Sequence, residues 1–197
     1  NSISAPVPFI QNNIDSTLHI LEYARQLDNL EKFIYFSTDE VYGSAPVGKY
    51  YAEGDRFNCG NPYSASKAAA ECICQAYSNT YRMPIIITNT MNVIGQRQHP
   101  EKFVPKVIKK VLSGETVTIH SNQEKTKAGS RFYIHARNIA DALLHIINNC
   151  DENLDNYDSS LGRFNIVGEK ETDNLQLAQL IAKILGKELK YEMVDFH

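Results

Sequence analysis

The chain has 197 residues, of which 43% are hydrophobic and 22% are charged, as in ordinary soluble globular proteins. Its formal net charge of -3 comes from 20 basic and 23 acidic residues without a basic block, so we expect no nucleic-acid partner. No apolar stretch reaches the roughly 20 residues of a membrane-spanning helix, and residues 1–9 lack the features of a secretory signal. We therefore expect a cytoplasmic protein without a membrane partner.

The cysteines and histidines do not form the spacing of a metal site. Cys59, Cys72, Cys74 and Cys150 contain no paired C-x-x-C units, and the six histidines include no H-E-x-x-H and no pair four residues apart. We expect free thiols, as in a reducing compartment, and no bound metal.

The first half of the chain alternates between helix and strand patterns. In residues 11–27 apolar side chains recur at three- and four-residue spacing, which predicts a helix with one buried face. Residues 33–36 are a short apolar run typical of a buried strand. Residues 43–62 are rich in turn formers and predict a loop, and residues 63–81, rich in alanine and free of Gly and Pro, predict the longest helix.

A second apolar strand, at residues 85–87, ends like the first in polar residues. Strands that are apolar on both faces and alternate with helices indicate an α/β fold with a parallel sheet covered by helices on both sides. Ligands bind such sheets beyond the carboxyl ends of the strands. Residues 37–40 and 88–92 are therefore expected at the functional edge.

The second half of the chain is also mixed. We predict the following elements there: helices at residues 103–112, 137–149 and 175–185, strands at 117–120 and 163–167, a lysine-bearing loop through Gly129, and an acidic loop at 150–160.

Tyr63 and Lys67 are spaced i, i+4, so both lie on one face of the predicted helix. An ammonium near a phenol favours the phenolate and would lower the tyrosine pKa from about 10 toward a value useful for a general base. The alternative is a packed tyrosine beside a solvated lysine, because the spacing alone is common.

Asp39 and Glu40 are adjacent carboxylates directly after a buried strand. Two carboxyl groups in different surroundings can divide the roles of acid and base, and the alternative is a solvated pair. Together with Thr38, the Tyr63–Lys67 helix and Asn92 at the second strand end, they are hard to assign to chance.

These residues lie in motifs that resemble those of the extended short-chain dehydrogenase/reductase family, most of all its dTDP-glucose 4,6-dehydratases. The motifs are STDEVYG at 37–43, NPYSASKAAAE at 61–71, TNTMNVIG at 88–95, HPEKFVPK at 99–106 and FNIVG at 164–168. The resemblance implies that residues 1–95 are the carboxy-terminal part of a Rossmann-type NAD-binding domain. Residues 96–197 would be mainly a small nucleotide-sugar-binding lobe, with some segments returning to the Rossmann part.

The resemblance also implies a reaction. Tyr63 would take the proton of the sugar C4 hydroxyl while hydride leaves C4 for NAD, Lys67 would hold the nicotinamide ribose, and Thr38 would hydrogen-bond at O4. Glu40 would then remove the C5 proton, Asp39 would protonate the departing C6 hydroxyl, and the hydride would return to C6. The product would be a 4-keto-6-deoxy sugar.

Further residues match family positions for binding. The resemblance implies that the nucleotide-diphosphate sugar is bound by Asn92, Lys102, Phe103, Arg131 and Asn165.

The resemblance places Ser37 and Val93, with Tyr63 and Lys67, near the cofactor. The sequence departs from the family at Val93, where asparagine is frequent, and at Phe132, where an acidic residue is common.

The glycine-rich loop that binds a dinucleotide pyrophosphate is missing. No two of the ten glycines are two or three positions apart, so neither G-x-x-G-x-x-G nor G-x-G-x-x-G occurs. The chain would be a fragment, a subunit completed by another chain, or a remnant, and we favour the fragment. We expect poor solubility or association of the piece by itself, and the resemblance implies a homodimer of the complete protein.

Two other functions stay open. One is a nucleotide-sugar epimerase or decarboxylase of the same superfamily, which the Asp39–Glu40 pair disfavours. The other is a non-catalytic nucleotide-sugar-binding or assembly subunit, which fits the missing loop.

Overall fold

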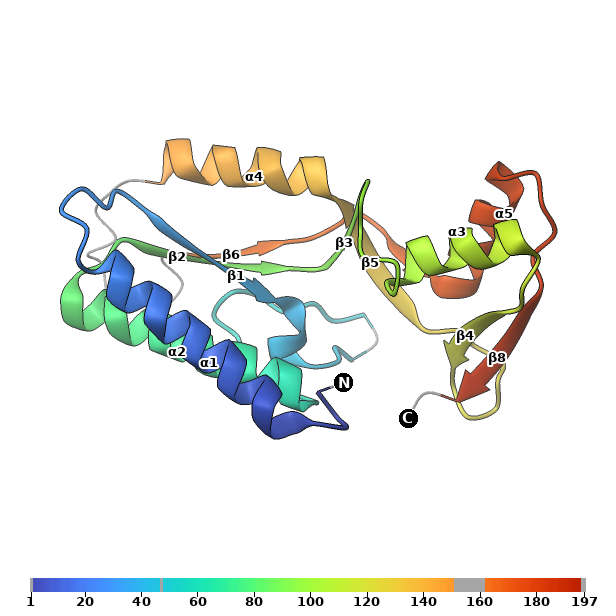
Figure 1. The fold of residues 1–197 in the computed structure, drawn as a ribbon, viewed down its shortest axis with the longest axis horizontal. Coiled ribbons are helices and arrows are strands. Elements are labelled where there is room, and N and C mark those ends of the chain that lie inside the picture. The colour runs from blue at the N-terminus through green and yellow to red at the C-terminus, as the bar shows by residue number, and fades with distance from the viewer. Residues whose placement is uncertain (1, 47, 151–161, 196–197) are drawn as a thin grey trace. The chain divides into compact units, whose positions relative to one another are not determined.

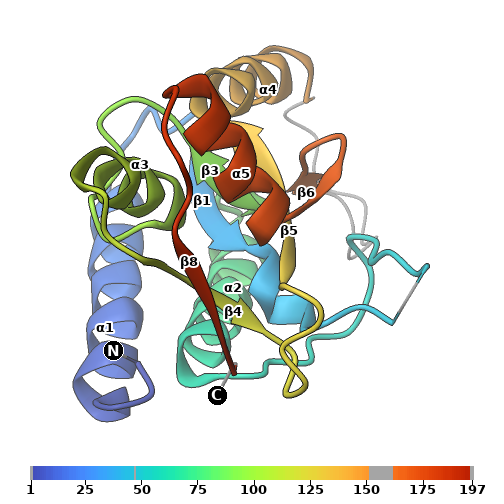
Figure 2. The same cartoon turned by 90° about the vertical axis from the view of Figure 1, so that its right-hand side faces the viewer.

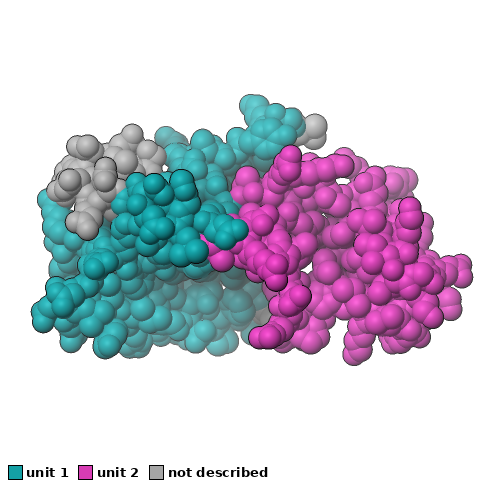
Figure 3. Space-filling view, turned by 90° about the horizontal axis from the view of Figure 1, so that it is seen from above, with its two compact units in different colours: residues 1–90, 141–166 teal, residues 91–140, 167–197 magenta. Residues whose placement is uncertain are grey.

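The computed structural model describes residues 2–46, 48–150 and 162–195. The chain divides into two compact units (Figure 3). Unit 1 comprises residues 1–90 and 141–166, and unit 2 comprises residues 91–140 and 167–197. No helix in the described part of the chain is long and apolar enough to cross a membrane.

Unit 1 is built on a parallel three-stranded sheet in the order β1-β2-β6. Its strands are β1 (Phe33–Thr38), β2 (Ile85–Thr90) and β6 (Arg163–Ile166). Helices α1 (Pro6–Ala24) and α2 (Pro62–Tyr81) cover one face, and α4 (Ala136–Asn149), which enters unit 1 at Asp141, lies over the other (Figure 1). The predicted α/β fold, with a parallel sheet and helices on both faces, is confirmed.

Side chains from α1, α2 and β2 form the core of unit 1 under the two helices. Leu21 of α1 and Cys74 of α2 are completely buried, and Ile85 and Ile87 of β2 pack against them. The predicted apolar face of the first helix therefore packs on the sheet. The helix begins at Pro6, earlier than the predicted residue 11, because proline is tolerated in the first helical turn, where no intrahelical N–H bond is lost.

A side-chain cap sets the start of α2. Asn61 Oδ1 accepts a hydrogen bond of 2.8 Å from the Ser64 N–H, and Ser64 Oγ accepts one of 3.2 Å from the Asn61 N–H. Pro62 follows as the first helical residue. This reciprocal cap fixes the helix on which Tyr63 and Lys67 lie.

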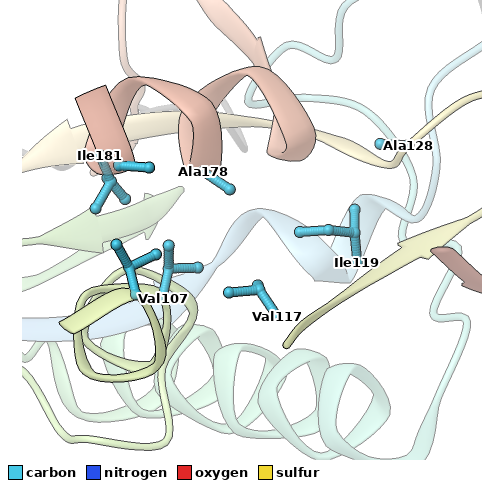
Figure 4. Close-up of a cluster of buried hydrophobic side chains, with 8 residues drawn as sticks. Val107, Val117, Ile119, Ala128, Ala178 and Ile181 are labelled. Carbon is cyan, nitrogen blue, oxygen red and sulfur yellow. The ribbon is translucent and has the colours of Figure 1, made fainter. Parts of the chain in front are cut away.

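The described part of unit 2 contains two small sheets, two complete helices and the first residues of α4. The elements are β3 (Asn92–Ile94), β5 (Ser130–His135) and β7 (Glu171–Asp173) in one sheet, β4 (Val117–Ser121) and β8 (Tyr191–Asp195) in a parallel pair, and helices α3 (Phe103–Ser113) and α5 (Asn174–Ile184). Figure 2 shows α3 and α5 beside the β4–β8 pair. Between them Val107, Ile119, Ala178 and Ile181 are buried in one apolar cluster (Figure 4).

Four strands of unit 2 were not predicted. These are β3, β5, β7 and β8, of which β3 and β7 have three residues each. Residues 151–160 of the predicted acidic loop lie outside the described residues.

Candidate active site

Three polar residues form one row across the carboxyl edge of the unit 1 sheet. Ser37 of β1 is in register with Asn89 of β2, and Asn89 is in register with Asn165 of β6. In-register neighbours of a parallel sheet point to the same face, so the three side chains lie together. The predicted functional edge is therefore polar on three adjacent strands. Two members of this row, Ser37 and Asn89, are buried.

Thr38, Asp39 and Glu40 form the turn that follows β1. The backbone passes into a 3-10 helix, η1 (Asp39–Tyr42), whose N-cap is Thr38. Thr38 Oγ1 accepts a hydrogen bond of 3.3 Å from the Glu40 N–H and donates one of 3.2 Å to Asp39 Oδ1. Thr38 is buried, Asp39 is half-buried and Glu40 is exposed. The two carboxylates therefore have different surroundings, which is the condition for different roles.

Glu40 is tied to the beginning of α2. Asn61, the N-cap of that helix, donates from Nδ2 to Glu40 Oε2 over 3.0 Å. One residue thus both caps the helix that carries Tyr63 and holds the second carboxylate of the strand-end turn.

The structure brings Tyr63 close to the Thr38–Glu40 turn, and the side chains of this turn change the pKa of Tyr63. Burial raises the pKa of Tyr63, the Glu40 carboxylate raises it further, and a hydrogen bond with Thr38 opposes these effects. The lowering of the Tyr63 pKa predicted from the Lys67 spacing is therefore wrong for this structure, because burial outweighs the favourable contacts.

Lys67 points toward the end of β1. Its Nζ donates to the Phe36 carbonyl over 2.5 Å and lies 4.2 Å from the centroid of the Tyr35 ring. Burial lowers the pKa of Lys67. The ammonium is thus held by backbone and an aromatic face rather than directed at Tyr63.

Glu71 is a site residue that sequence reasoning missed. It is completely buried on α2, and its carboxyl group accepts hydrogen bonds from Ser37 Oγ and, over 2.7 Å, from Asn89 Nδ2. Its other oxygen is 3.1 Å from a guanidinium nitrogen of Arg163. Burial raises the pKa of Glu71. The sequence does carry a signal for Glu71: it follows Lys67 by four residues and Tyr63 by eight, which places it on the same face of the helix.

Asn165 holds the loop between η1 and α2. Its Oδ1 accepts from Tyr42 Oη over 3.2 Å, its Nδ2 donates to the Tyr51 carbonyl over 3.3 Å, and its N–H donates to Glu53 Oε1 over 2.9 Å. The tyrosine rings stack with centroids 5.6 Å apart. These contacts anchor the loop at the strand ends, and a contact of Asn165 with substrate stays a prediction.

The other predicted substrate-binding residues lie in unit 2. Asn92 begins β3 and is exposed, Lys102 is the exposed N-cap of α3, and half-buried Phe103 is the first residue of that helix. Arg131 lies on β5, next to β3, with a guanidinium N–H donating to the Ser130 carbonyl over 2.8 Å.

Val93, predicted near the cofactor, lies on β3, and its carbonyl accepts a hydrogen bond of 2.6 Å from Gln98. The approach of Val93 and the other unit 2 residues to the strand ends of unit 1 stays a prediction.

A sequence model described as the NAD dependent epimerase/dehydratase family matches residues 1–166. The chain belongs to this family. The resemblance to extended short-chain dehydrogenases/reductases inferred from the motifs is thereby confirmed.

This family member is similar to both dehydratases and epimerases. It is 35% identical over 195 residues to a dTDP-D-glucose 4,6-dehydratase of Dictyostelium discoideum, a match that covers 93% of this chain and 42% of that protein. Its fold matches DesIV, a dTDP-glucose 4,6-dehydratase of Streptomyces venezuelae solved with NAD and TYD, with a TM-score of 0.84, 26% identity and coverage of 100% and 57% of the two chains.

A UDP-glucose 4-epimerase of Thermus thermophilus, solved with NAD, matches as well, with a TM-score of 0.84, 25% identity and coverage of 98% and 60%. The chain spans roughly half the length of these relatives, as the shares of 42%, 57% and 60% show. Because the dehydratase and the epimerase fit equally well, the fold does not separate the two activities.

Proposed function

We propose that this chain provides the catalytic and substrate-binding residues of an NAD-dependent nucleotide-sugar 4,6-dehydratase, which converts dTDP-glucose to dTDP-4-keto-6-deoxyglucose. The observation that carries the proposal is the turn at the end of β1. Asp39 and Glu40 are adjacent there, and Glu40 is hydrogen-bonded to the N-cap of the helix that bears Tyr63. Elimination of water needs one group that removes a proton and another that donates one, and this turn supplies two carboxyl groups.

The residues fit the nicotinamide-ribose end of the cofactor NAD. Tyr63 and Lys67 lie on one face of α2, and they contact the residues on either side of Ser37: Tyr63 is hydrogen-bonded with Thr38, and the Lys67 ammonium is held at the Phe36 carbonyl. The chemistry that NAD would supply when bound is the acceptance of a hydride from C4 and its return to C6, so that the cofactor ends unchanged. The sequence contains no glycine-rich turn for the pyrophosphate, so this chain's residues do not provide that part of the cofactor site.

Each residue of the turn and the helix has a defined task in the proposal. Tyr63, whose pKa is raised in this structure, must first give up its own proton; as the phenolate it then takes the proton of the C4 hydroxyl, and Thr38 hydrogen-bonds at O4. Oxidation at C4 makes the C5 proton acidic, and Glu40 removes it. Asp39 gives its proton to the C6 oxygen, which leaves as water. The contact between Thr38 and Asp39 supports this arrangement, because it holds the O4 ligand beside the acid.

The diphosphate and nucleotide are assigned to unit 2. Arg131 and Lys102 are exposed cations, and a planar guanidinium suits phosphate oxygens because it can donate two parallel hydrogen bonds. Asn92 and Phe103 complete the proposed site.

A homodimer is part of the proposal. Helices α1 and α2 pack together, and α1 presents exposed apolar side chains, among them Val7 at 62%, Ile20 at 55% and Tyr23 at 67% exposure. A second copy of the helix pair would cover such a surface.

Mass spectrometry separates the candidate activities. The chain is incubated with NAD and dTDP-glucose, by itself and together with an amino-terminal dinucleotide-binding half. A dehydratase gives a product lighter by one water, whereas an epimerase gives an isomer of unchanged mass. A decarboxylase would instead act on a nucleotide-linked uronic acid, with loss of carbon dioxide. Ligand binding without any product would favour the non-catalytic subunit.

A further inference from the structure

Glu71 lies on the same face of α2 as the proposed base. It follows Lys67 by one helical turn and Tyr63 by two, and its side chain is completely buried. A carboxyl group without partners is costly to bury, so its contacts decide what it does.

The carboxyl group of Glu71 contacts all three strands of the unit 1 sheet. It accepts hydrogen bonds from Ser37 of β1 and Asn89 of β2, and it forms an ion pair with Arg163 of β6. Ser37 and Asn89 belong to the polar row at the carboxyl edge. One side chain therefore joins α2 to the carboxyl ends of β1 and β2, where the proposed chemistry takes place, and to the beginning of β6.

The contacts of Glu71 lead directly to the strand-end turn. Asn89 Nδ2, which donates to Glu71, also lies 3.2 Å from the carbonyl oxygen of Thr38. Ser37, the other donor, is the residue before Thr38 in β1. Thr38 is the N-cap of η1, the 3-10 turn that carries Asp39 and Glu40. A single side chain, Asn89, therefore links the Glu71 carboxyl group to the beginning of that turn.

A role in stability alone would not require this arrangement. Buried ion pairs can often be replaced by apolar residues of similar volume without loss of stability, so burial of Glu71 and Arg163 is weak evidence for a stabilising role. Directional hydrogen bonds to two strand ends, by contrast, fix a geometry that apolar packing does not.

We propose that Glu71 is a positioning residue, which sets the placement of the Tyr63–Lys67 helix relative to the Thr38–Glu40 turn through Ser37 and Asn89. The inference rests on the proposed dehydratase function. In this inference Glu71 acts through its hydrogen-bonded neighbours and not by contact with substrate or cofactor.

Two double variants separate positioning from stability. Glu71→Leu/Arg163→Met replaces the ion pair with apolar side chains and removes the acceptor for Ser37 and Asn89. Glu71→Gln/Arg163→Met also removes both charges but keeps an amide oxygen as that acceptor. Leu21→Ala, in the core under α1, is the control for a loss of stability elsewhere in unit 1.

The first measurement is NMR of the side-chain amide of Asn89 in the full chain. In the unmodified chain and in Glu71→Gln/Arg163→Met, we expect slow hydrogen exchange of this amide, because it is buried and bonded. In Glu71→Leu/Arg163→Met the protection should fall well below that of the unmodified chain, because only the Thr38 carbonyl then remains as an acceptor, and in Leu21→Ala it should remain. Protection in the leucine variant equal to that of the unmodified chain would overturn the inference, whatever the protein's activity.

The second measurement is dehydratase turnover at a temperature where all variants are folded. We expect kcat to fall roughly 100-fold in Glu71→Leu/Arg163→Met, with KM little changed, and to recover in Glu71→Gln/Arg163→Met. Equal kcat in the two double variants would contradict positioning. If the unmodified protein forms no product even with a dinucleotide-binding half, the proposed function fails, and the Asn89 measurement still decides whether Glu71 holds the strand ends.

Discussion

Asn61 donates a hydrogen bond of 3.0 Å to Glu40 and also caps the helix on which Tyr63 lies. The two functions are separable. Asn61→Ser keeps an oxygen for the helix cap but is too short to reach Glu40, whereas Asn61→Ala loses both contacts. We expect the free energy of unfolding to fall by about 1 kcal/mol in the alanine variant and by little in the serine variant.

Turnover should fall to a similar extent in both Asn61 variants, because Glu40 is released in each. Urea unfolding and product formation, measured on the same preparations, check the two expectations. Turnover that followed stability, with the serine variant fully active, would show that the contact with Glu40 has no part in catalysis.

Replacing Asp39 tests the proposed acid. Asp39→Asn keeps the size of the side chain but cannot protonate the C6 oxygen, so elimination should slow by roughly 100- to 10,000-fold, while ligand binding remains nearly intact. Calorimetric titration with dTDP and the mass assay measure the two properties. Asp15→Asn, an exposed change on α1, is the matched control. Unchanged elimination in Asp39→Asn would exclude this role.

The raised pKa of Tyr63 has a consequence for stability at high pH. Because the folded chain holds the Tyr63 proton more tightly than the unfolded chain, whose tyrosines ionise near the ordinary value of 10.0, stability is lost as pH rises above that value. Tyr63→Phe removes this ionisable group. Above pH 10 the free energy of unfolding, measured with urea, should therefore fall less steeply with pH in the variant than in the unmodified chain. The same pH dependence in both proteins would contradict a raised Tyr63 pKa.

Gly43 ends the η1 turn in a conformation that other residues avoid. Its φ is 75°, and a Cβ there would lie 2.4 Å from the Asn58 carbonyl oxygen. Gly48 has the same φ of 75° but open space around it. We expect Gly48→Ala to cost about 1–2 kcal/mol of stability from backbone strain alone. Gly43→Ala should cost more and should also reduce turnover, because the turn must shift. Equal losses in thermal unfolding would contradict this account.

Local patterns in the sequence were sufficient to predict most of unit 1. The apolar runs that became β1 and β2, and the alanine-rich segment that became α2, carry their structure in neighbouring residues. The strand β8 does not, because Tyr191–Asp195 becomes a strand only by pairing with Val117–Ser121, more than seventy residues earlier. Pairing partners so distant in sequence leave no local pattern.

The candidate site was predictable in its residue types but not in its contacts. The motifs indicated Thr38, Asp39, Glu40, Tyr63 and Lys67, and the structure places all five in unit 1. Spacing suggested that Lys67 acts on Tyr63, whereas in the fold its ammonium is held by the Phe36 carbonyl and the Tyr35 ring. The hydrogen bonds of Asn165 likewise depend on the loop between η1 and α2, because the local sequence does not specify the path of that loop.

The central claim is tested most directly by NMR of dTDP-glucose incubated in D2O with this chain and NAD, with and without an amino-terminal dinucleotide-binding half. We predict a 4-keto-6-deoxy product that carries deuterium at C5, because the proton removed there by Glu40 exchanges with solvent. An unchanged sugar, or an epimer that retains its C6 hydroxyl, in the presence of that half would contradict the dehydratase assignment.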